Sequence, residues 1–256
     1  MGVSRLDCSV DLLAVVVGAL AGGDDGVMGM ELLGGEPAFG PWRAVDASAI
    51  IEFVLGGGRW PLGRPLVVAV DGRGGSGKST LAAALAGTHV GAVVVHTDDV
   101  AWHEPFFGWG PLLRDGVLLP LRRGEAVAFR PPAWGRHGRD GWIEVPAGSG
   151  LVVVEGVGAA QRSFGDLIDA SIWVQSDFVE AERRGIARDV AEGLNGGREA
   201  AVAFWHEWMS HELTFLSEQR PWERARLVVA GTNVMDLPAG QFAVSPPTPS
   251  TPVSRP

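Results

Sequence analysis

A glycine-rich stretch with a lysine and three hydroxyl residues is the part of this sequence best suited to chemistry. Residues Asp71 to Thr80 read DGRGGSGKST, and the spacing G-x-x-x-x-G-K-[ST] runs from Gly72 to Ser79. Glycines let backbone N–H groups converge on phosphate oxygens without a Cβ in the way, while the lysine reaches the phosphates and the serine hydroxyl is a magnesium ligand. The predicted phosphate-binding residues are Gly72, Arg73, Gly74, Gly75, Ser76, Gly77, Lys78, Ser79 and Thr80.

Acidic residues follow two further apolar runs of the chain. Asp98 and Asp99 come after the run 92–96, and Glu155 ends the run 151–155. If these runs are parallel strands, their carboxyl ends meet at the edge of the sheet that also carries the phosphate loop. The two aspartates then either contact Mg²⁺ or accept a proton from an attacking hydroxyl, and Glu155 serves the metal with Ser79. The alternative for each acid is a helix cap, a turn or a solvated strand end.

The elements that must position these residues are strands alternating with helices. The five apolar runs are continuous rather than alternating, as in strands covered on both faces, and helical patterns separate several of them. The runs are 66–70, 92–96, 151–155, 171–175 and 226–230, and the helical patterns are 79–86, 178–193 and 199–219. We therefore predict an α/β fold of the P-loop NTPase type, in three layers (α/β/α) around a five-stranded parallel sheet.

The chain divides into three parts by composition. Residues 1–63 form a Gly-rich extension with helices near 6–20 and 46–55, residues 64–241 form the nucleotide-binding domain, and residues 242–256 are expected to be a disordered tail. Within the domain, the Trp- and Pro-rich insert 98–150 leaves the carboxyl end of a strand, where substrates bind in α/β proteins. The longest apolar stretch near the start, 12–21, is about half of a bilayer span, so no membrane association is expected.

Charge and composition exclude several classes of function. The 256 residues carry a formal charge of −9, which argues against a general nucleic-acid-binding protein. The single cysteine, Cys8, excludes an intramolecular disulfide framework and fits a cytoplasmic protein. The chain has ten tryptophans and no tyrosine. Composition leaves the oligomeric state open, a homodimer included.

A basic helix is predicted over 178–193. It begins with a capping box, Asp177-x-x-Glu180, and carries Arg183, Arg184 and Arg188. These arginines either contact phosphates or form a solvated face paired with nearby acids. A second helical segment, His206 to Glu212, superficially resembles a zinc-binding helix, but its histidines are five residues apart and HExxH requires four.

Taken together, DGRGGSGKST, HTDD, VVVEG and ERRGIARD resemble the P-loop kinases of the uridine kinase and phosphoribulokinase-like group, over about residues 64–232. More narrowly, TDD, FRPPAW and VEGVGA resemble uridine kinase-like proteins of high-GC bacteria. The resemblance implies ATP and Mg²⁺ as cofactors, Asp98 as catalytic base with a metal contact, and Asp99 as its neighbour on the substrate side. It also implies a mobile lid near 183–198, hinged near 195–197, whose arginines, Arg184 and Arg188 foremost, act with Lys78 on the phosphates.

The substrate segment departs from the family. Uridine kinases carry a Pro-x-Tyr-Asp-Phe-like stretch followed by His and Arg, whereas this chain has Pro132-Ala133 in place of Tyr-Asp. The residues left as substrate contacts, or as packing residues of the loop, are Arg130, Trp134, Arg136 and His137. We therefore expect a phosphotransferase that takes a nucleotide and a small-molecule hydroxyl. The alternatives are a kinase of a non-nucleoside acceptor, such as an antibiotic or secondary metabolite, a non-catalytic nucleotide-binding regulator, and an interaction role for the Trp-rich insert.

Overall fold

The computed structural model describes residues 30–56, 58–193 and 196–247, and the helix predicted near 6–20 lies outside them. A central sheet has the strand order β1-β9-β8-β7-β2-β6-β3. Its parallel strands are β2 (Leu66–Gly72), β3 (Val93–His96), β6 (Leu151–Glu155), β7 (Ala170–Gln175) and β8 (Leu227–Ala230). The five predicted apolar runs are therefore the five parallel strands, and β2, which leads into the phosphate loop, is the middle one of these five.

Two antiparallel strands extend this sheet at one edge, which corrects the prediction of five strands. β9 (Gln241–Ser245) pairs with β8, and β1 (Arg43–Asp46) pairs with β9. The prediction of disorder from residue 242 onward was wrong at its start, because Ala243 and Ser245 turn one face of β9 into the protein. Residues 43–46, assigned above to a separate extension, are an edge strand of the same sheet.

Helices α2 (Ala47–Leu55) and α3 (Lys78–Gly87) cover one face of the sheet. The Asp46 side chain caps α2 by accepting a hydrogen bond from the Ala49 N–H at 2.8 Å, and Gly56 ends the helix with a left-handed φ of 59°. Ile50 and Leu85 are fully buried against the β2, β6 and β7 side chains. Burying each such side chain contributes roughly 1.5–3 kcal/mol, so this face anchors the helix that follows the phosphate loop.

The predicted insert covers part of the other face. It consists of short elements: α4 (Thr97–Ala101), α5 (Gly110–Leu113), a π-helical turn Arg114–Leu118, α6 (Leu119–Arg122), the hairpin strands β4 (Val127–Phe129) and β5 (Ile143–Val145), and between them α7 (Pro132–His137). Their apolar side chains, Trp109 and Leu113 among them, pack on Val67 of β2 and Val154 of β6. The insert thus shares one core with this face of the sheet, and this core fixes the loops beside the carboxyl end of β3.

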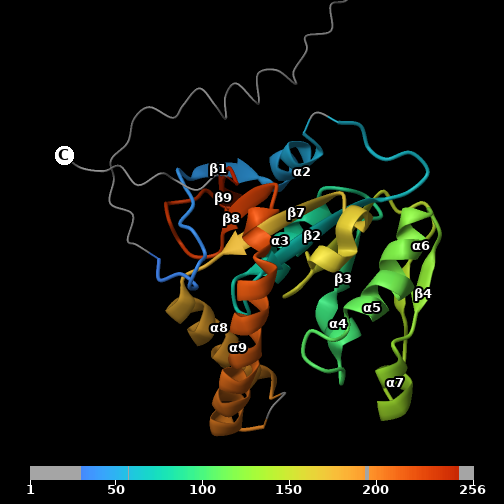
Figure 1. The fold of residues 1–256 in the computed structure, drawn as a ribbon. Helices are drawn as coiled ribbons and strands as arrows, with labels where there is room; N and C mark the ends of the chain where they lie inside the picture. Colours follow the sequence, from blue (N-terminus) through green and yellow to red (C-terminus); the bar gives the residue numbers. More distant parts are fainter. Residues whose placement is uncertain (1–29, 57, 194–195, 248–256) are drawn as a thin grey trace, which may run out of the picture.

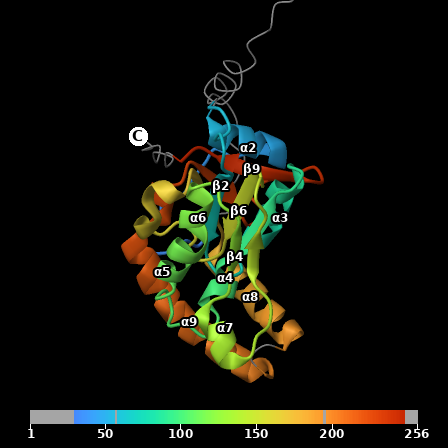
Figure 2. The ribbon, with the colours of Figure 1, turned by 90° about the vertical axis from the view of Figure 1, so that its right-hand side faces the viewer.

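Helix α9 (Arg198–Gln219) packs on another part of this face, and helix α8 (Phe178–Glu192) packs on α9. In Figure 1, α8 and α9 extend beyond the sheet on the same side as α4 and α7, and Figure 2 shows this arrangement after a turn of 90°. The carboxyl-terminal part of α9 packs through Leu216 on Trp173 of β7 and on Trp222. The three-layer α/β/α prediction is confirmed. Among the described residues, no helix is both long and apolar enough to cross a membrane.

Candidate nucleotide and phosphoryl-transfer site

The phosphate loop joins the buried strand β2 to α3. The Ser76 N–H donates to the Arg73 carbonyl at 3.2 Å, and Gly75 and Gly77 take left-handed φ values of 73° and 95°. Such φ values suit glycine and turn successive N–H groups toward one side of the loop. Helix α3 begins directly after Gly77 without a side-chain cap, so the positive end of its dipole is open to an anion. The loop has the conformation and the charge that phosphate binding requires.

Lys78 lies across the loop that precedes it. Its side chain is buried, and Nζ donates a hydrogen bond of 2.6 Å to the carbonyl oxygen of Arg73. An ammonium held by one backbone oxygen keeps two further N–H donors. Lys78 is therefore positioned over the concave side of the loop, with donors left for phosphate oxygens.

Ser79, Glu155 and His96 form a chain of polar contacts beside Lys78. The Ser79 hydroxyl donates to Glu155 Oε1 at 3.2 Å, and Glu155 Oε2 lies 2.8 Å from His96 Nδ1. Burial acts to raise the pKa of Glu155, but the His96 hydrogen bond and the Lys78 charge outweigh it and hold that pKa below its ordinary value. Glu155 therefore remains an anion next to the Ser79 hydroxyl. A carboxylate must be ionised to act with that hydroxyl on Mg²⁺.

Asp98 belongs to the first turn of α4, directly after β3. Its side chain stays open to solvent, although protein atoms surround the carboxylate closely enough for desolvation to raise its pKa. The negative charge of Glu155 adds to this rise, while Lys78 and Arg188 oppose it. A carboxylate with a raised pKa that is close to Lys78 has the properties of a general base beside the phosphate site.

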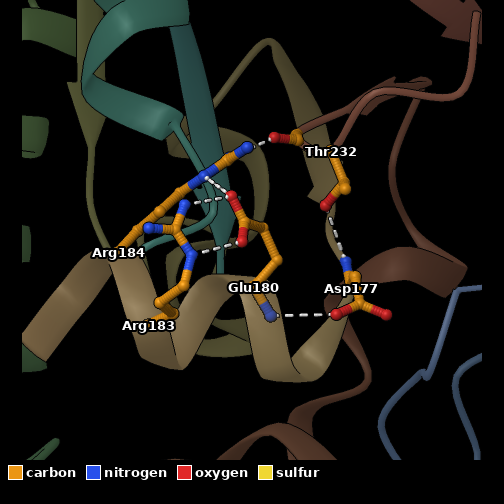
Figure 3. Close-up of polar contacts among 6 residues, drawn as sticks. Asp177, Glu180, Arg183, Arg184 and Thr232 are labelled. Atoms are coloured by element: carbon orange, nitrogen blue, oxygen red, sulfur yellow. Dashed lines mark hydrogen bonds and ion pairs between the residues drawn. The ribbon is translucent and has the colours of Figure 1, made fainter.

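The arginines of α8 divide into two kinds. Arg183 is exposed and is held by Glu180, whereas Arg184 contacts Glu180 and also donates from Nη1 to the Gly231 carbonyl at 2.6 Å (Figure 3). Asp177 caps this helix by accepting the Glu180 N–H, and its own N–H donates to the Thr232 hydroxyl (Figure 3). The start of α8 is thereby joined to the turn after β8, next to the phosphate loop.

Arg188 lies one turn further along α8. It pairs with Asp189 at 2.8 Å, and the charge of Asp98 on the opposite side of the site helps to raise its pKa against the effect of burial. Arg184 reaches the turn beside the phosphate loop, whereas Arg183 fits the solvated-face alternative. Arg188 is exposed and paired with Asp189, and its electrostatic interaction with Asp98 relates it to the site. The hinge predicted near 195–197 lies partly outside the described residues.

The predicted substrate residues are placed beside Asp98 by the insert, but most already have partners. The Asp99 carboxylate pairs with Arg139, and the Trp134 ring N–H donates to the Asp99 carbonyl at 2.8 Å. Trp134 is buried and its ring lies 3.9 Å from the Arg139 guanidinium. Trp134 therefore packs against the segment that carries Asp99 and does not present its ring to solvent.

Three further predicted substrate residues lie at the outer side of this segment. Arg130 donates to the Arg139 carbonyl at 2.9 Å, and Arg136 pairs with Glu104 at the same distance. The exposed His137 ring stacks on His103 with ring centres 4.1 Å apart. These contacts tie α7 to the loop after α4, and the imidazole rings are the part of the segment most open to an acceptor.

Sequence reasoning missed three residues that support the site. His96 fixes Glu155, Arg139 neutralises Asp99, and Glu212 of α9 accepts the Gly74 N–H at 2.6 Å. His96 could have been found from its place two residues before Asp98, at the end of a strand. Glu212 gave no such signal, because it lies 138 positions from Gly74.

No protein-family model matches this chain, and no curated protein matches it significantly. Solved structures similar to it include a protein from Silicibacter sp. TM1040 assigned as a fructose transport system kinase, with 24% identity and a TM-score of 0.45 over 66% of this chain and 91% of that one. A possible uridine kinase from Bacillus stearothermophilus has 19% identity and a TM-score of 0.46, covering 71% and 96%. D-glycerate 3-kinase from Cryptococcus neoformans has 16% identity and a TM-score of 0.45, covering 77% and 98%.

The strand order, the phosphate loop after the central strand β2 and the acid at the end of β6 define a P-loop nucleotide-binding fold. The fold class expected from the sequence is therefore confirmed, with two strands more than expected.

Proposed function

We propose that this protein is an ATP- and Mg²⁺-dependent phosphotransferase that moves the γ-phosphoryl group to a small-molecule hydroxyl. The observation that carries the proposal is the meeting of four groups at one edge of the sheet. Lys78 crosses the loop, Ser79 is bonded to Glu155, and Asp98 interacts electrostatically with Lys78. A phosphate loop alone binds nucleotides, and a base beside it adds the means to activate an acceptor.

The residues fit both cofactors. The uncapped start of α3 and the free donors of Lys78 suit the phosphates of ATP, and Ser79 with Glu155 and Asp98 suits Mg²⁺. The described residues contain no cluster of three or more His, Cys, Asp or Glu side chains arranged to hold a metal. Mg²⁺ in kinases takes much of its coordination from phosphate oxygens and water, and needs only one or two protein carboxylates.

Each residue then has a distinct part in the reaction. Bound MgATP supplies an electrophilic phosphorus at the γ-position. Asp98 accepts the proton of the acceptor hydroxyl while the acceptor oxygen bonds to that phosphorus. The bond between the γ-phosphorus and the oxygen shared with the β-phosphate breaks, and ADP leaves. Lys78 and the α8 arginines stabilise the charge that spreads over the transferred oxygens and the ADP leaving group.

A non-nucleoside acceptor is the second candidate, and one observation favours it. At the position where the resembling kinases carry Tyr-Asp, this chain has Pro132 and Ala133, and Ala133 is fully buried in the insert core. That position offers neither a hydroxyl nor a carboxylate to a sugar, and recognition of a hydroxyl depends on such groups. The polar groups that the insert offers instead are the stacked imidazoles of His103 and His137 and the Arg139–Asp99 pair.

A coupled assay of ADP release over nucleosides, sugars, hydroxy acids, vitamins and aminocyclitols tests the proposal. We expect at least one acceptor to stimulate release, and Lys78→Ala and Asp98→Asn to abolish the stimulation. Asp98→Asn should leave nucleotide binding nearly intact, since Lys78, Ser79 and Glu155 remain and Asn keeps the volume of the side chain and one oxygen for the metal. Asp115→Asn, at an exposed acid of the same insert that pairs with Arg114, is the matched control and should keep full activity. Acceptor-dependent release that persists in Asp98→Asn would refute the role of the base.

A further inference from the structure

Arg73, the second residue of the phosphate loop, has a side chain that the proposed mechanism does not use. The side chain is 1% exposed, and its guanidinium lies 3.8 Å from the centre of the Phe178 ring, at the first residue of α8. Within the described part of the chain, none of its three guanidinium nitrogens has a hydrogen-bond partner. A buried guanidinium without hydrogen bonds is costly unless a nearby anion compensates its charge.

That anion is Glu212 of α9, which is also fully buried. Its Oε2 lies 3.6 Å from Arg73 Nε, while its Oε1 accepts the Gly74 N–H of the phosphate loop at 2.6 Å. Burial lowers the pKa of Arg73, and the charges of Glu212 and Glu36 oppose that effect. One carboxylate therefore balances the Arg73 charge and also fixes the backbone of the neighbouring loop residue.

Helices α8 and α9 pack closely on this part of the loop. A Cβ at Gly74 would lie 3.0 Å from the Trp205 ring of α9, and Gly185 of α8 leaves no room for a Cβ against the same ring. On the other side of Gly74, the Gly75 backbone lies against the Ala181 carbonyl of α8. The loop, α8 and α9 thus meet at Arg73 and Glu212, and Arg184 and Arg188 extend from this same α8.

We propose that Glu212 and Arg73 are a positioning pair that sets the conformation of the phosphate loop and the seat of α8 on it. Neither side chain touches the phosphates. Glu212 acts through the Gly74 N–H, and Arg73 acts through Phe178 and the charge of Glu212. This inference rests on the proposed function in one respect, that the ligand of the loop is a nucleotide phosphate. Glu212 and Arg73 then fix the loop conformation that binds it.

Two double variants separate positioning from plain stabilisation. Arg73→Met with Glu212→Gln removes both charges and keeps an acceptor for the Gly74 N–H. Arg73→Met with Glu212→Leu removes both charges and the acceptor as well. Both variants remove Arg73 and the Glu212 charge together, and both take the same cation away from the buried Glu36, so that loss cancels between them. Cooperative thermal unfolding checks that each variant folds.

Amide hydrogen exchange at Gly74 and calorimetric binding of MgADP are then compared between the two variants. A lost hydrogen bond of ordinary strength corresponds to about a tenfold change in an equilibrium. We expect exchange at Gly74 to be about tenfold faster, and MgADP binding about tenfold weaker, in the Leu variant than in the Gln variant. Exchange at a core amide of β7, such as that of Trp173, should be equal in the two.

Equal exchange at Gly74 and equal MgADP affinity in the two variants would overturn the proposal, since the pair would then act only on stability. Loss of cooperative unfolding in the Gln variant would overturn it as well, because the charges would then be needed for the fold itself. The exchange measurement needs neither nucleotide nor turnover. A protein that shows the expected exchange but no acceptor-stimulated ADP release would refute the proposed kinase activity and leave the positioning pair intact.

Discussion

Substitution of Gly75 by alanine tests how closely α8 is seated on the phosphate loop. Gly75 has a φ of 73°, and a Cβ at this position would overlap the carbonyl oxygen of Ala181 in the second turn of α8. Gly77, two residues along the same loop, has a φ of 95°, but the nearest atom to its Cβ would be the Gly231 carbonyl oxygen at 4.0 Å. The two glycines therefore share a left-handed backbone and differ in the space beside it.

The expected magnitudes follow from this difference. Alanine in a left-handed conformation costs roughly 1–2 kcal/mol at either position. Gly75→Ala must in addition displace α8 by about 1 Å, because the overlap is with backbone and no side chain can rotate away. Overpacking of this kind costs roughly 1–3 kcal/mol, so Gly75→Ala should be destabilised by that much more than Gly77→Ala.

Urea unfolding of the nucleotide-free protein, followed by tryptophan fluorescence, measures the comparison directly. Thermal unfolding gives a second reading, at about 2–4 °C for each kcal/mol in a protein of this size. The nucleotide is omitted because Gly77→Ala also obstructs the phosphate site. If Gly75→Ala proves no less stable than Gly77→Ala, α8 does not rest on the loop as described here, and the seat inferred for Arg184 and Arg188 is wrong.

Four further predictions concern single charged groups. Arg184→Gln should lower kcat by about 10²-fold or more, and Arg183→Gln should lower it by less than about twofold. Of these two arginines, only Arg184 extends beyond Glu180 to the Gly231 carbonyl beside the phosphate loop. Steady-state kinetics with the identified acceptor measure both effects. The raised pKa of Asp98 places the acid limb of the kcat–pH profile above the ordinary aspartate value of 3.8, with activity rising as pH rises, and a limb at or below 3.8 would contradict it. Glu155→Gln should raise the Mg²⁺ concentration needed for half-maximal activity at least tenfold, and an unchanged magnesium titration would remove Glu155 from the metal site. Burial raises the pKa of Asp71 to about 6 although three backbone N–H groups donate to it, so the folded state holds an extra proton between about pH 4 and 6. The free energy of unfolding should therefore fall by up to about 3 kcal/mol as pH rises through this window. Urea unfolding at a series of pH values should show this fall in the unchanged protein and not in Asp71→Asn.

Local spacing made the phosphate loop and the parallel strands predictable. The pattern from Gly72 to Ser79 is contiguous, and each buried parallel strand is a continuous apolar run because both of its faces are covered. The helix boundaries were predicted well for the same reason: Asp46, Asp177 and Gly56 cap within a few residues of themselves. The predicted helix over 178–193 is observed as Phe178–Glu192.

The antiparallel edge of the sheet was not predictable in this way. β9 is only five residues long, mixes polar with apolar residues and stands next to a Pro- and Ser-rich tail, so it lacks the continuous apolar run of the parallel strands. Its partner β1 comes about 200 positions earlier in the chain, and only the closing of the sheet brings Arg43 beside Val244. Composition assigned both segments to the ends of the chain, whereas their pairing places them in the fold.

The sequence by itself determined that this protein has a phosphate loop, which acids follow neighbouring strands, and that the fold is α/β. It also indicated Arg184 and Arg188 as phosphate-facing, but only through a family resemblance. The tertiary structure decided which groups come into contact: Glu155 with His96, Asp99 with Arg139, and Gly74 with Glu212. The physical reason is that motifs act through neighbours in the chain, while the charge, the hydrogen bonding and the free space of a side chain depend on residues that only folding brings together.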